Sequence, residues 1–267
     1  MGIISKFHEY LKYIMLTESY IIHSQKLNNL NTIVYLLTKD FGFIQAFYNK
    51  KNYNNTTYKY SKQSILQPFN SFLVNLNNKK NQIISIEENF VYINKNNSNN
   101  KAYFYKSYIT ELIFLFYKNY NNDPNSIIFQ SYQKSLKKMD HAENINNLKI
   151  AQHHFENSLL KDLGFEVNFL ETLNSENDLY YQYNIKNNIF THIEINKDNL
   201  ANLDINTDKI TLRCLINNLI FPKNIILNLK KNIYNNNINL YAGKILNYQI
   251  IQYYLNYKTV YSYEHIS

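Results

Sequence analysis

Short runs of β-branched and aromatic residues alternate with polar turns over the first third of the chain. Between residues 20 and 87 there are five such runs, separated by segments rich in Asn, Asp, Gly and Lys. The runs are Tyr20 to Ser24, Thr32 to Thr38, Phe43 to Tyr48, Ser71 to Leu76 and Gln82 to Glu87. Closely spaced strands with no helix between most of them predict a small closed β-barrel of the OB type.

Apolar residues change to a helical spacing beyond a polar connector at residues 94–100. A first stripe at i, i+3, i+4 and i+7 predicts a helix with one core-facing side. Its residues are Ile109, Leu112, Ile113 and Phe116. A second helix is predicted from Ile127 to Met139, with lysines near its end that suit the negative pole of the helix dipole.

The strongest helix signal lies in the middle of the chain and ends at a glycine. Apolar residues at spacings of three and four form a stripe along one face, which we expect to be buried. They are Leu148, Ala151, Phe155, Leu159 and Leu163. Gly164 then stands where a helix stop requires a left-handed residue, and Phe165 can fold back onto the last turn as in a Schellman motif.

The remainder combines one hairpin with further helices. Leu179 to Tyr183 and Phe190 to Ile195 flank a polar turn, which predicts a small β-hairpin. Helical spacing returns in three later segments. These are Ile205 to Phe221, Ile225 to Tyr234 and a last helix that a turn at Gly243 and Lys244 opens.

The elements together predict an α+β protein, with an N-terminal five-stranded OB-fold β-barrel and a mainly α-helical C-terminal domain that contains the small hairpin. We assign residues 15–93 to the barrel, 94–100 to the polar connector and 101–267 to the helical domain. Residues 1–14 are interpreted as an amphipathic N-terminal extension.

The composition favours a polyanionic partner. The chain of 267 residues is 45% hydrophobic, enough to bury a core, and it carries a net charge of +8. Nucleic acid and an anionic membrane face both suit that charge, and a basic protein with neither partner would show the same balance. Among 28 basic residues only Arg213 is an arginine, so phosphate contacts would come from lysines. Binding should then depend on salt and discriminate little between bases.

The residues show no reactive constellation, and we expect no enzyme and no metal site. With four glycines, neither a P-loop nor a dinucleotide-binding fingerprint can be written. His153 and His154 are adjacent, so they do not make an i, i+4 metal pair. The segment Asp140 to Glu143 fits a helix start better than a metal site. Scattered acidic residues also argue against a metal-dependent nuclease.

The single cysteine and the absence of long apolar runs limit the disulfides, the thiolate metal sites and the cellular location that we expect. Cys214 excludes an internal disulfide and a multi-thiolate zinc cage, and its apolar neighbours predict a buried, inert thiol. No signal-peptide pattern and no run of eighteen apolar residues occurs. We therefore expect a cytoplasmic protein with no membrane partner.

Several short segments resemble segments of the RecO family of bacterial recombination mediators, and they occur along the chain in the same order as in that family. The middle helix carries the family's order of Phe-Glu, two leucines, Leu-Gly-aromatic and Val-Asn-Phe. Further matches are Ile22-His23-Ser24, Leu36 to Gly42, Leu66-Gln67-Pro68-Phe69, Tyr108 to Leu112 and Gly243-Lys244. An ordinary core helix with a glycine cap would explain the middle helix alone, but the order and spacing of the segments favour the family over residues 15 to 261.

The resemblance implies a DNA-repair function without covalent chemistry. RecO proteins bind DNA through an OB-fold, so this chain would bind single- and double-stranded DNA and anneal complementary strands. With the partner RecR it would help RecA replace the single-stranded DNA-binding protein SSB. It would be a monomer when free and associate with the nucleoid during repair. No cofactor is implied, because the region that holds a four-cysteine zinc module in some relatives, Phe169 to Asp178, has no cysteine here.

A loop rich in lysine and tyrosine is the predicted DNA contact. Lysines neutralise phosphates, and aromatic faces accept stacked bases without reading sequence. A solvated loop in a tyrosine-rich chain would look the same, and the position of the family's basic loop favours DNA. The predicted DNA-binding residues are Lys26, Tyr48, Lys50, Lys51, Tyr58, Lys59, Tyr60, Lys62 and Lys244. Asn247, Tyr248 and Gln249 stand where relatives carry Lys, Ser and Arg, so part of the family's basic surface is not carried over.

The resemblance also implies a site for the acidic, phenylalanine-terminated tail of SSB on the middle helix. Such a tail needs a hydrophobic slot rimmed by cations. Relatives carry arginines just before the Phe-Glu pair, where this chain has His153 and His154 beside Phe155, with Lys161 about two turns further on. Histidines in this position would make the affinity for the tail rise as the pH falls.

One alternative function stays open at this point. A general OB-fold module that binds RNA or DNA, without the SSB or RecR partnership, would share the barrel, the charge and the lysine loop. Binding of an SSB tail peptide would separate the two hypotheses.

Overall fold

The computed structural model describes residues 14–49, 68–77, 82–87, 100–118, 126–169, 180–193, 209–234 and 236–266. The chain divides into two units, each of which packs mainly within itself. The first comprises Met1–Glu143 together with Val260–Ser267, and the second comprises Asn144–Thr259. The predicted boundary at residues 94–100 does not coincide with this division, because two helices after the connector pack with the N-terminal strands.

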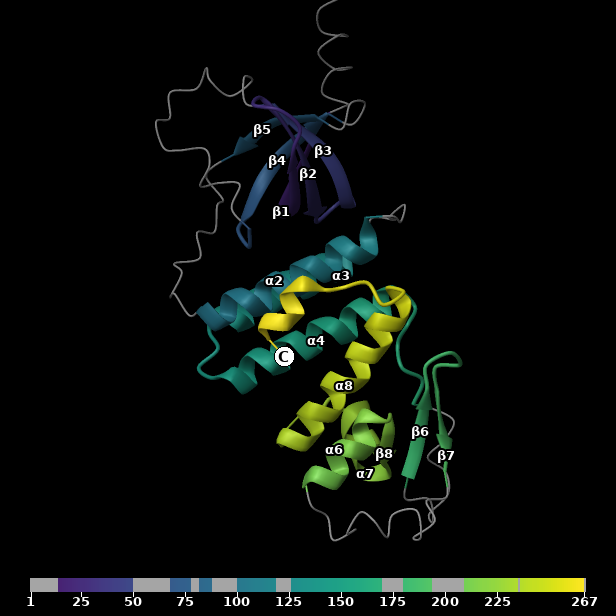
Figure 1. Ribbon diagram of the computed structural model, residues 1–267. Coiled ribbons are helices and arrows are strands. Elements are labelled where there is room, and N and C mark those ends of the chain that lie inside the picture. The colour runs from purple at the N-terminus through teal and green to yellow at the C-terminus, as the bar shows by residue number, and fades with distance from the viewer. Residues whose placement is uncertain are drawn as a thin grey trace, which may run out of the picture. The chain divides into compact units, whose positions relative to one another are not determined.

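A curled, mainly antiparallel sheet opens the first unit (Figure 1). Its strands are β1 (Ile14–Lys26), β2 (Asn31–Thr38), β3 (Gly42–Asn49), β4 (Ser71–Asn77) and β5 (Gln82–Glu87). The paired order is β1-β2-β3-β5-β4, and β4 pairs again with β1. β3 and β5 run parallel and are joined at one described pair, Phe47 and Gln82, so this link is weaker than the antiparallel ladders.

Alternate strand residues fill the inside of the curled sheet, as the two-residue period of a strand requires. The buried cluster consists of Ile21, Val34, Leu36, Ala46, Tyr48, Phe72, Val74, Leu76 and Ile83. The tight turn between β2 and β3 is closed by Thr38, whose hydroxyl accepts from the Phe41 amide at 3.0 Å and donates to the Gly42 carbonyl at 2.9 Å. Gly42 has a φ of +66°, where a side chain would be strained.

Helices α2 (Asn100–Tyr117) and α3 (Ser126–Asp140) lie side by side in the first unit, and α2 contacts β1 (Figure 1). The predicted stripe of α2 is buried, as expected. Tyr20 of β1 packs against two rings of α3, with centroid distances of 5.4 Å to Phe129 and 5.1 Å to Tyr132. These aromatic contacts explain why α3 belongs to the same unit as the sheet.

The C-terminal segment returns to the first unit. The short 3₁₀ helix η3 (Tyr261–His265) contacts α2. The carboxylate of Glu111 accepts from the Tyr261 amide at 3.0 Å and from the Ser262 amide at 2.8 Å. A side chain of α2 thus satisfies backbone donors that η3 leaves without an internal partner.

The second unit is mainly helical and contains a small three-stranded sheet with the order β7-β6-β8 (Figure 1). Its elements are α4 (Ile145–Asp162), β6 (Tyr180–Asn184), β7 (Ile189–His192), α6 (Lys209–Asn217), β8 (Ile220–Pro222), α7 (Lys223–Lys230) and α8 (Asn237–Tyr254). α8 contacts α4, α6 and α7. α8 is therefore the central helix of this unit.

Helix α4 begins and ends as its sequence dictates. Asn144 caps its start by accepting from the Asn147 amide at 3.0 Å. At its end Gly164 has a φ of +78°, and two amides bond back, Gly164 to Lys161 at 3.1 Å and Phe165 to Leu160 at 2.7 Å. This is the bond pattern of a Schellman motif, so the predicted stop is confirmed.

The α+β class, with an N-terminal curled sheet followed by helices, is confirmed, and so is the hairpin of β6 and β7. Two predictions for the later chain were wrong. The segment predicted as one helix to Phe221 ends at Asn217 and is followed by the strand β8, which pairs with β6. Gly243 opens no turn, because α8 begins at Asn237, capped by the side chain of Asn236.

Two local predictions also need correction. Cys214 is exposed, because it lies on the outer side of the amphipathic helix α6, not among the buried residues. The segment Asp140 to Glu143 does not cap a helix, because the cap of α4 is Asn144. Asp140 is instead the last residue of α3, where its carboxylate forms an ion pair with Lys106 of α2.

Candidate functional site

An exposed row of side chains crosses the outer face of the curled sheet. Gln25 of β1 pairs with Ile33 of β2, and Ile33 pairs with Phe47 of β3. Directly opposed residues of neighbouring strands share a face, so we call these three residues the outer row. Phe47 is 44% exposed, Gln25 is exposed and Ile33 is partly exposed. An aromatic ring held at the surface of a rigid strand can accept a stacked base.

Tyr48, the strand tyrosine that we predicted to stack on DNA, faces the inside of the curled sheet. It belongs to the buried cluster inside the sheet, with only 6% of its surface exposed, and burial raises the pKa of its phenol. Neighbouring strand residues point to opposite faces, so Phe47 lies on the exposed face of the sheet and Tyr48 on the buried one. Gln45 lies two positions before Phe47 on β3, so both side chains point to the same face. Because Gln45 is polar, it could have indicated from the sequence that this face is exposed.

Of the predicted DNA-binding lysines, the structure places two. Lys26 is exposed at the last position of β1, one residue after Gln25 of the outer row. Lys244 lies in α8 of the second unit, so the two belong to different units. The other predicted residues lie outside the described part of the chain. These are Lys50, Lys51, Tyr58, Lys59, Tyr60 and Lys62.

The second unit contains a buried polar network between α4 and α8. The carboxylate of Glu156 is 2% exposed and accepts from the Gln152 amide at 2.7 Å and from the Asn247 amide at 3.1 Å. Nδ1 of His153 lies 3.3 Å from Oε2 of Glu156. Burial raises the pKa of Glu156, but the hydrogen bond and charge of His153, with the two amides, outweigh burial and hold this pKa below its ordinary value.

Gly243 lets α8 approach this network closely. A Cβ atom at this position would lie 2.6 Å from Nε2 of His153 and 3.1 Å from the Tyr234 ring. The His153 and Tyr234 rings stack, with centroids 4.9 Å apart and planes 9° from parallel. Nε2 of His153 also lies 3.3 Å from the carbonyl oxygen of Leu240. The glycine that we predicted as a turn residue is therefore a packing residue inside a helix.

A pocket with a volume of about 380 Å³ lies on one side of the network, between α4, α6 and α8. We call it the basic pocket, because three cationic side chains, Lys149, Arg213 and Lys244, line it. Its described lining contains no acidic side chain; the other lining residues are Asn146, Gln152, His153, Asn237, Leu240 and Tyr241. Such a pocket can bind an anion.

Two of these cations, Lys149 and Lys244, are close enough to repel each other. The pKa of Lys244 is lowered, first by burial and then by the positive charge of Lys149, while the charge of Glu156 opposes the shift. The guanidinium of Arg213 lies over the Tyr241 ring, with Cζ 5.3 Å from its centroid. This contact orients the arginine by a cation–π interaction. Like charges thus converge on a shared, partly buried space.

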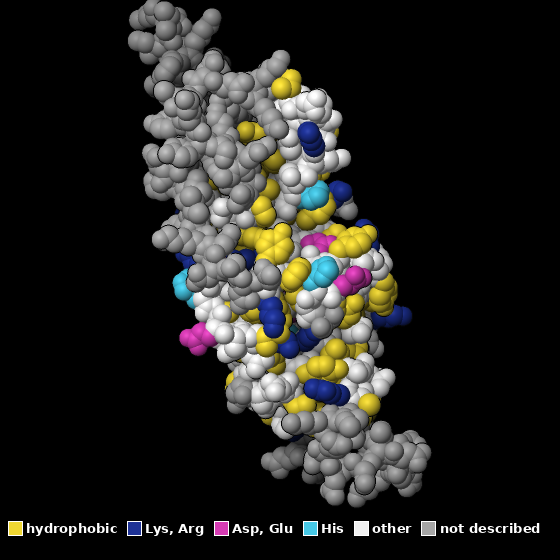
Figure 2. All heavy atoms as spheres, turned by 60° about the vertical axis from the view of Figure 1, so that its left-hand side comes forward, with side chains coloured by type: hydrophobic (Ala, Val, Ile, Leu, Met, Phe, Trp, Pro, Cys, Tyr) yellow, Lys and Arg dark blue, Asp and Glu magenta, His cyan; other side chains and the backbone are white. Residues whose placement is uncertain are grey.

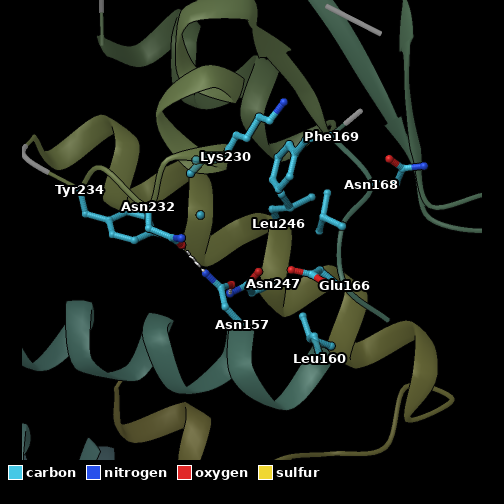
Figure 3. A pocket seen from close by; sticks show the side chains of 13 residues that line it. Asn157, Leu160, Glu166, Asn168, Phe169, Lys230, Asn232, Tyr234, Leu246 and Asn247 are labelled. Carbon is cyan, nitrogen blue, oxygen red and sulfur yellow. Dashed lines mark hydrogen bonds between the residues drawn. The ribbon is translucent and has the colours of Figure 1, made fainter. Parts of the chain in front are cut away.

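A second pocket, of about 470 Å³, is lined by residues of α4, α7 and α8, among them Asn247 of the network (Figure 3). Asn157 donates to the side chain of Asn232 at 3.0 Å and accepts from Asn247 at 2.8 Å. Apolar side chains such as Leu160 and Phe169 also line it, and its charged lining residues are one acid and one base, Glu166 and Lys230. Its paired amides and balanced charge give this pocket less reason to bind an anion than the basic pocket has.

The predicted SSB-tail residues do not form one surface. Phe155 is 0% exposed and His153 is 2% exposed, so both side chains pack in the interior and neither presents a surface to a tail docked on the outside of α4. His154 is partly exposed, and its ring meets Tyr234 edge-on with a centroid distance of 5.9 Å. Lys161 is exposed, with Nζ 3.7 Å from Oε1 of Glu166.

The sequence interpretation missed two residues of the basic pocket. Lys149 stands four positions before His153 on α4, a spacing that places both on one side of a helix. That spacing could have identified it. Arg213 was noted only as the single arginine of the chain, because its position beside α8 depends on how the later helices fold together.

Charge alone does not mark a site on the face of the molecule that Figure 2 shows. Figure 2 shows lysine and arginine side chains spread among hydrophobic and neutral ones, without a single large cluster on that face. Among the described residues no group of three or more His, Cys, Asp or Glu side chains could hold a metal ion. No helix in the described ranges combines the length and the hydropathy needed to cross a membrane.

Comparison with models of known protein families and with curated proteins found no match to this chain. The candidate function therefore depends on the residues and on the geometry described above.

Proposed function

We propose that the curled sheet is an OB-fold that binds nucleic-acid strands, and that the protein acts in DNA repair as a mediator of the RecO type. It would bind single- and double-stranded DNA, anneal complementary strands and, with RecR, help RecA replace SSB on single-stranded DNA. It would act in the cytoplasm at the nucleoid, as a monomer when free, and without covalent chemistry.

The order of the strands carries this proposal. The paired order β1-β2-β3-β5-β4, with β4 returning to β1 and β3 parallel to β5, supports the proposal, because a five-stranded OB barrel would have the same Greek-key order. OB-folds bind oligonucleotides on the face of strands 2 and 3 and on the adjoining loops. The outer row includes Ile33 of β2 and Phe47 of β3, so it lies on that face.

Strand binding would combine stacking with phosphate neutralisation. The exposed ring of Phe47 offers a stacking surface, and each stacked base contributes about 1–3 kcal/mol. Lys26 is exposed at the last position of β1, and Lys50 follows β3 directly in the chain. Lysines that screen phosphate repulsion let two complementary strands approach each other, which is the physical requirement for annealing.

The test is a titration of single-stranded DNA at several salt concentrations. Joint replacement of Lys50, Lys51, Lys59 and Lys62 by Ala should make the plot of log affinity against log salt concentration less steep. Its slope should fall in magnitude by about 0.7 for each lysine lost, and annealing should be slower. The matched control removes the same charge elsewhere, from lysines that are exposed on or just after helices. The control residues are Lys134, Lys138, Lys161 and Lys231.

Three outcomes distinguish the possible functions. Equal effects of both quadruple variants would contradict the assigned loop, because they would show only a dependence on net charge. DNA binding without capture by an SSB tail peptide or by RecR would favour a general OB-fold module for RNA or DNA. Magnesium-dependent cleavage of the DNA during the titration would overturn the proposal of a non-enzymatic protein.

A further inference from the structure

The basic pocket has features that strand binding by the sheet does not explain. Lys149, Arg213 and Lys244 converge on one space of about 380 Å³ from three different helices. Surface lysines that only keep a protein soluble do not need a shared cavity. Placing like charges close together costs free energy unless an anion offsets the repulsion.

Neutral donors complete the lining of the basic pocket. Asn146 and Asn237 add side-chain amides, and Asn237 is also the first residue of α8, an 18-residue helix. The first turn of a helix presents backbone N–H groups and the positive end of the helix dipole. Cations and N–H donors around one space are the groups that bind phosphate oxygens.

One acidic group, Glu156, acts on the charge of Lys244 and is itself engaged in hydrogen bonds. Its carboxylate accepts from the side-chain amides of Gln152 and Asn247 and lies 3.3 Å from His153. Its negative charge offsets part of the positive charge of Lys244. The carboxylate itself is not part of the described lining. The described lining of the pocket therefore keeps an excess of positive charge.

The lining favours a phosphate over an apolar peptide end. Leu240 is the one aliphatic side chain in the described lining, and the Tyr241 ring is already covered by Arg213. A peptide that ends in phenylalanine needs a hydrophobic slot, which this lining does not provide. A phosphate monoester needs several cations and N–H donors, which it does provide.

We propose that the basic pocket binds a terminal phosphate monoester, and that its natural ligand is the 5′-phosphorylated end of a nucleic-acid strand. The identity of the ligand rests on the proposed function, since a strand-binding protein would meet such ends. A terminal monoester carries up to two negative charges and three free oxygens, whereas an internal diester carries one charge and two. Three convergent cations therefore favour the strand end over the strand interior.

The direct test compares two single-stranded oligonucleotides of the same sequence, one with a 5′-phosphate and one with a 5′-hydroxyl. The wild-type protein should bind the phosphorylated strand about tenfold more tightly, as expected for added charge-assisted hydrogen bonds. Lys149→Gln and Arg213→Gln should each reduce this ratio toward one and leave the affinity for the hydroxyl strand unchanged. Lys161→Gln, an exposed lysine of the same helix outside the pocket, is the matched control and should keep the ratio.

A second measurement separates failure of the pocket from failure of the proposed function. Calorimetric titration with thymidine 5′-monophosphate should show binding that thymidine lacks and that Lys149→Gln weakens. If the mononucleotide binds and no oligonucleotide does, the pocket assignment stands while DNA binding fails. Inorganic phosphate that binds as tightly as the phosphorylated strand would overturn the assignment to a strand end.

Other outcomes would overturn the pocket assignment itself. A wild-type ratio of one between the two oligonucleotides would do so, and so would a Lys149→Gln variant that loses both strands equally, since the pocket would then be part of a general phosphate surface. An acidic peptide ending in phenylalanine that competes with the mononucleotide, and that Lys149→Gln no longer binds, would assign the pocket to a protein tail.

Discussion

The outer row of the sheet and the basic pocket differ in how they relate to the hydrophobic core. The outer row lies on the solvent side of a sheet whose other side is packed, so Phe47 can change without disturbing the buried cluster. The basic pocket is built on the polar network itself, because Gln152 and His153 belong to both. Changes at the sheet should therefore alter binding alone, whereas changes behind the pocket should alter stability as well.

The largest expected effect is a loss of stability from Phe155→Ala. Phe155 is fully buried in α4, and removing a buried phenylalanine ring typically costs about 3–5 kcal/mol because of lost contacts and the cavity left behind. Urea denaturation should show this loss. A change below about 1 kcal/mol would contradict the burial of Phe155 and would again allow it to contact a ligand at the surface.

Gly243→Ala should have the next largest effect. Alanine favours a helix over glycine by about 1 kcal/mol, but the new Cβ would lie 2.6 Å from the His153 ring. We expect a net destabilisation of about 1–3 kcal/mol from this overpacking. Thermal unfolding measures it. A stabilised variant would show that α8 does not approach α4 as closely as described.

Gly164→Ala is the matched control for that experiment. No atom lies within 4 Å of a Cβ built at Gly164, so only its left-handed backbone, with a φ of +78°, opposes a side chain. A cost of about 1–2 kcal/mol is expected from the backbone alone. In contrast to Gly243→Ala, the ring of His153 should keep its environment in an NMR spectrum.

At the sheet, Phe47→Ala should weaken single-stranded DNA binding about tenfold, the effect of losing one stacked base. Its unfolding temperature should change little because Phe47 is 44% exposed. Tyr48→Ala should do the reverse, reducing stability through the buried cluster and affecting DNA binding only through unfolding. Fluorescence anisotropy measures the DNA affinity of both variants, and thermal unfolding measures their stability. Equal losses of affinity in two folded variants would contradict the assigned face.

The smallest effect concerns pH. Because the pKa of Glu156 is held below its ordinary value of 4.5, its ionised form stabilises the folded state at pH values above 4.5. This contribution should be lost as the pH falls from 4.5 through the lower folded-state pKa. Urea unfolding between pH 6 and pH 3 should show a steeper loss for wild type than for Glu156→Gln. If the unfolding free energies of the two proteins fell in parallel with pH, the hydrogen bonds to Glu156 would contribute no pH-dependent stability.

Local signals in the sequence predicted much of the fold. Strand runs, the stripe of α4 and its Schellman stop follow from nearest-neighbour geometry, which the residues encode directly. Asparagine supplies the caps of α4 and α8. It also occupies left-handed positions after α7 and α8, at Asn232 with φ +55° and Asn256 with φ +53°. A chain with four glycines uses asparagine for this purpose.

The candidate sites were harder to predict, because they depend on packing between distant segments. Phe47 and Tyr48 are both aromatic, so composition could not decide which one faces solvent. Gly243 looks like a turn residue until the His153 ring is placed against it. Arg213 and Lys149 are 64 positions apart, and only the folding of α6 and α4 against α8 brings them to one pocket.

Photochemical cross-linking tests the central claim most directly. Single-stranded DNA that carries 5-bromodeoxyuridine would be cross-linked to the intact protein, and the modified peptides identified by mass spectrometry. The account predicts cross-links on β3, at Phe47 or its immediate neighbours, that a Phe47→Leu variant reduces. Cross-links confined to residues 144–259, with β1 to β3 unmodified, would contradict the proposal that the curled sheet binds DNA.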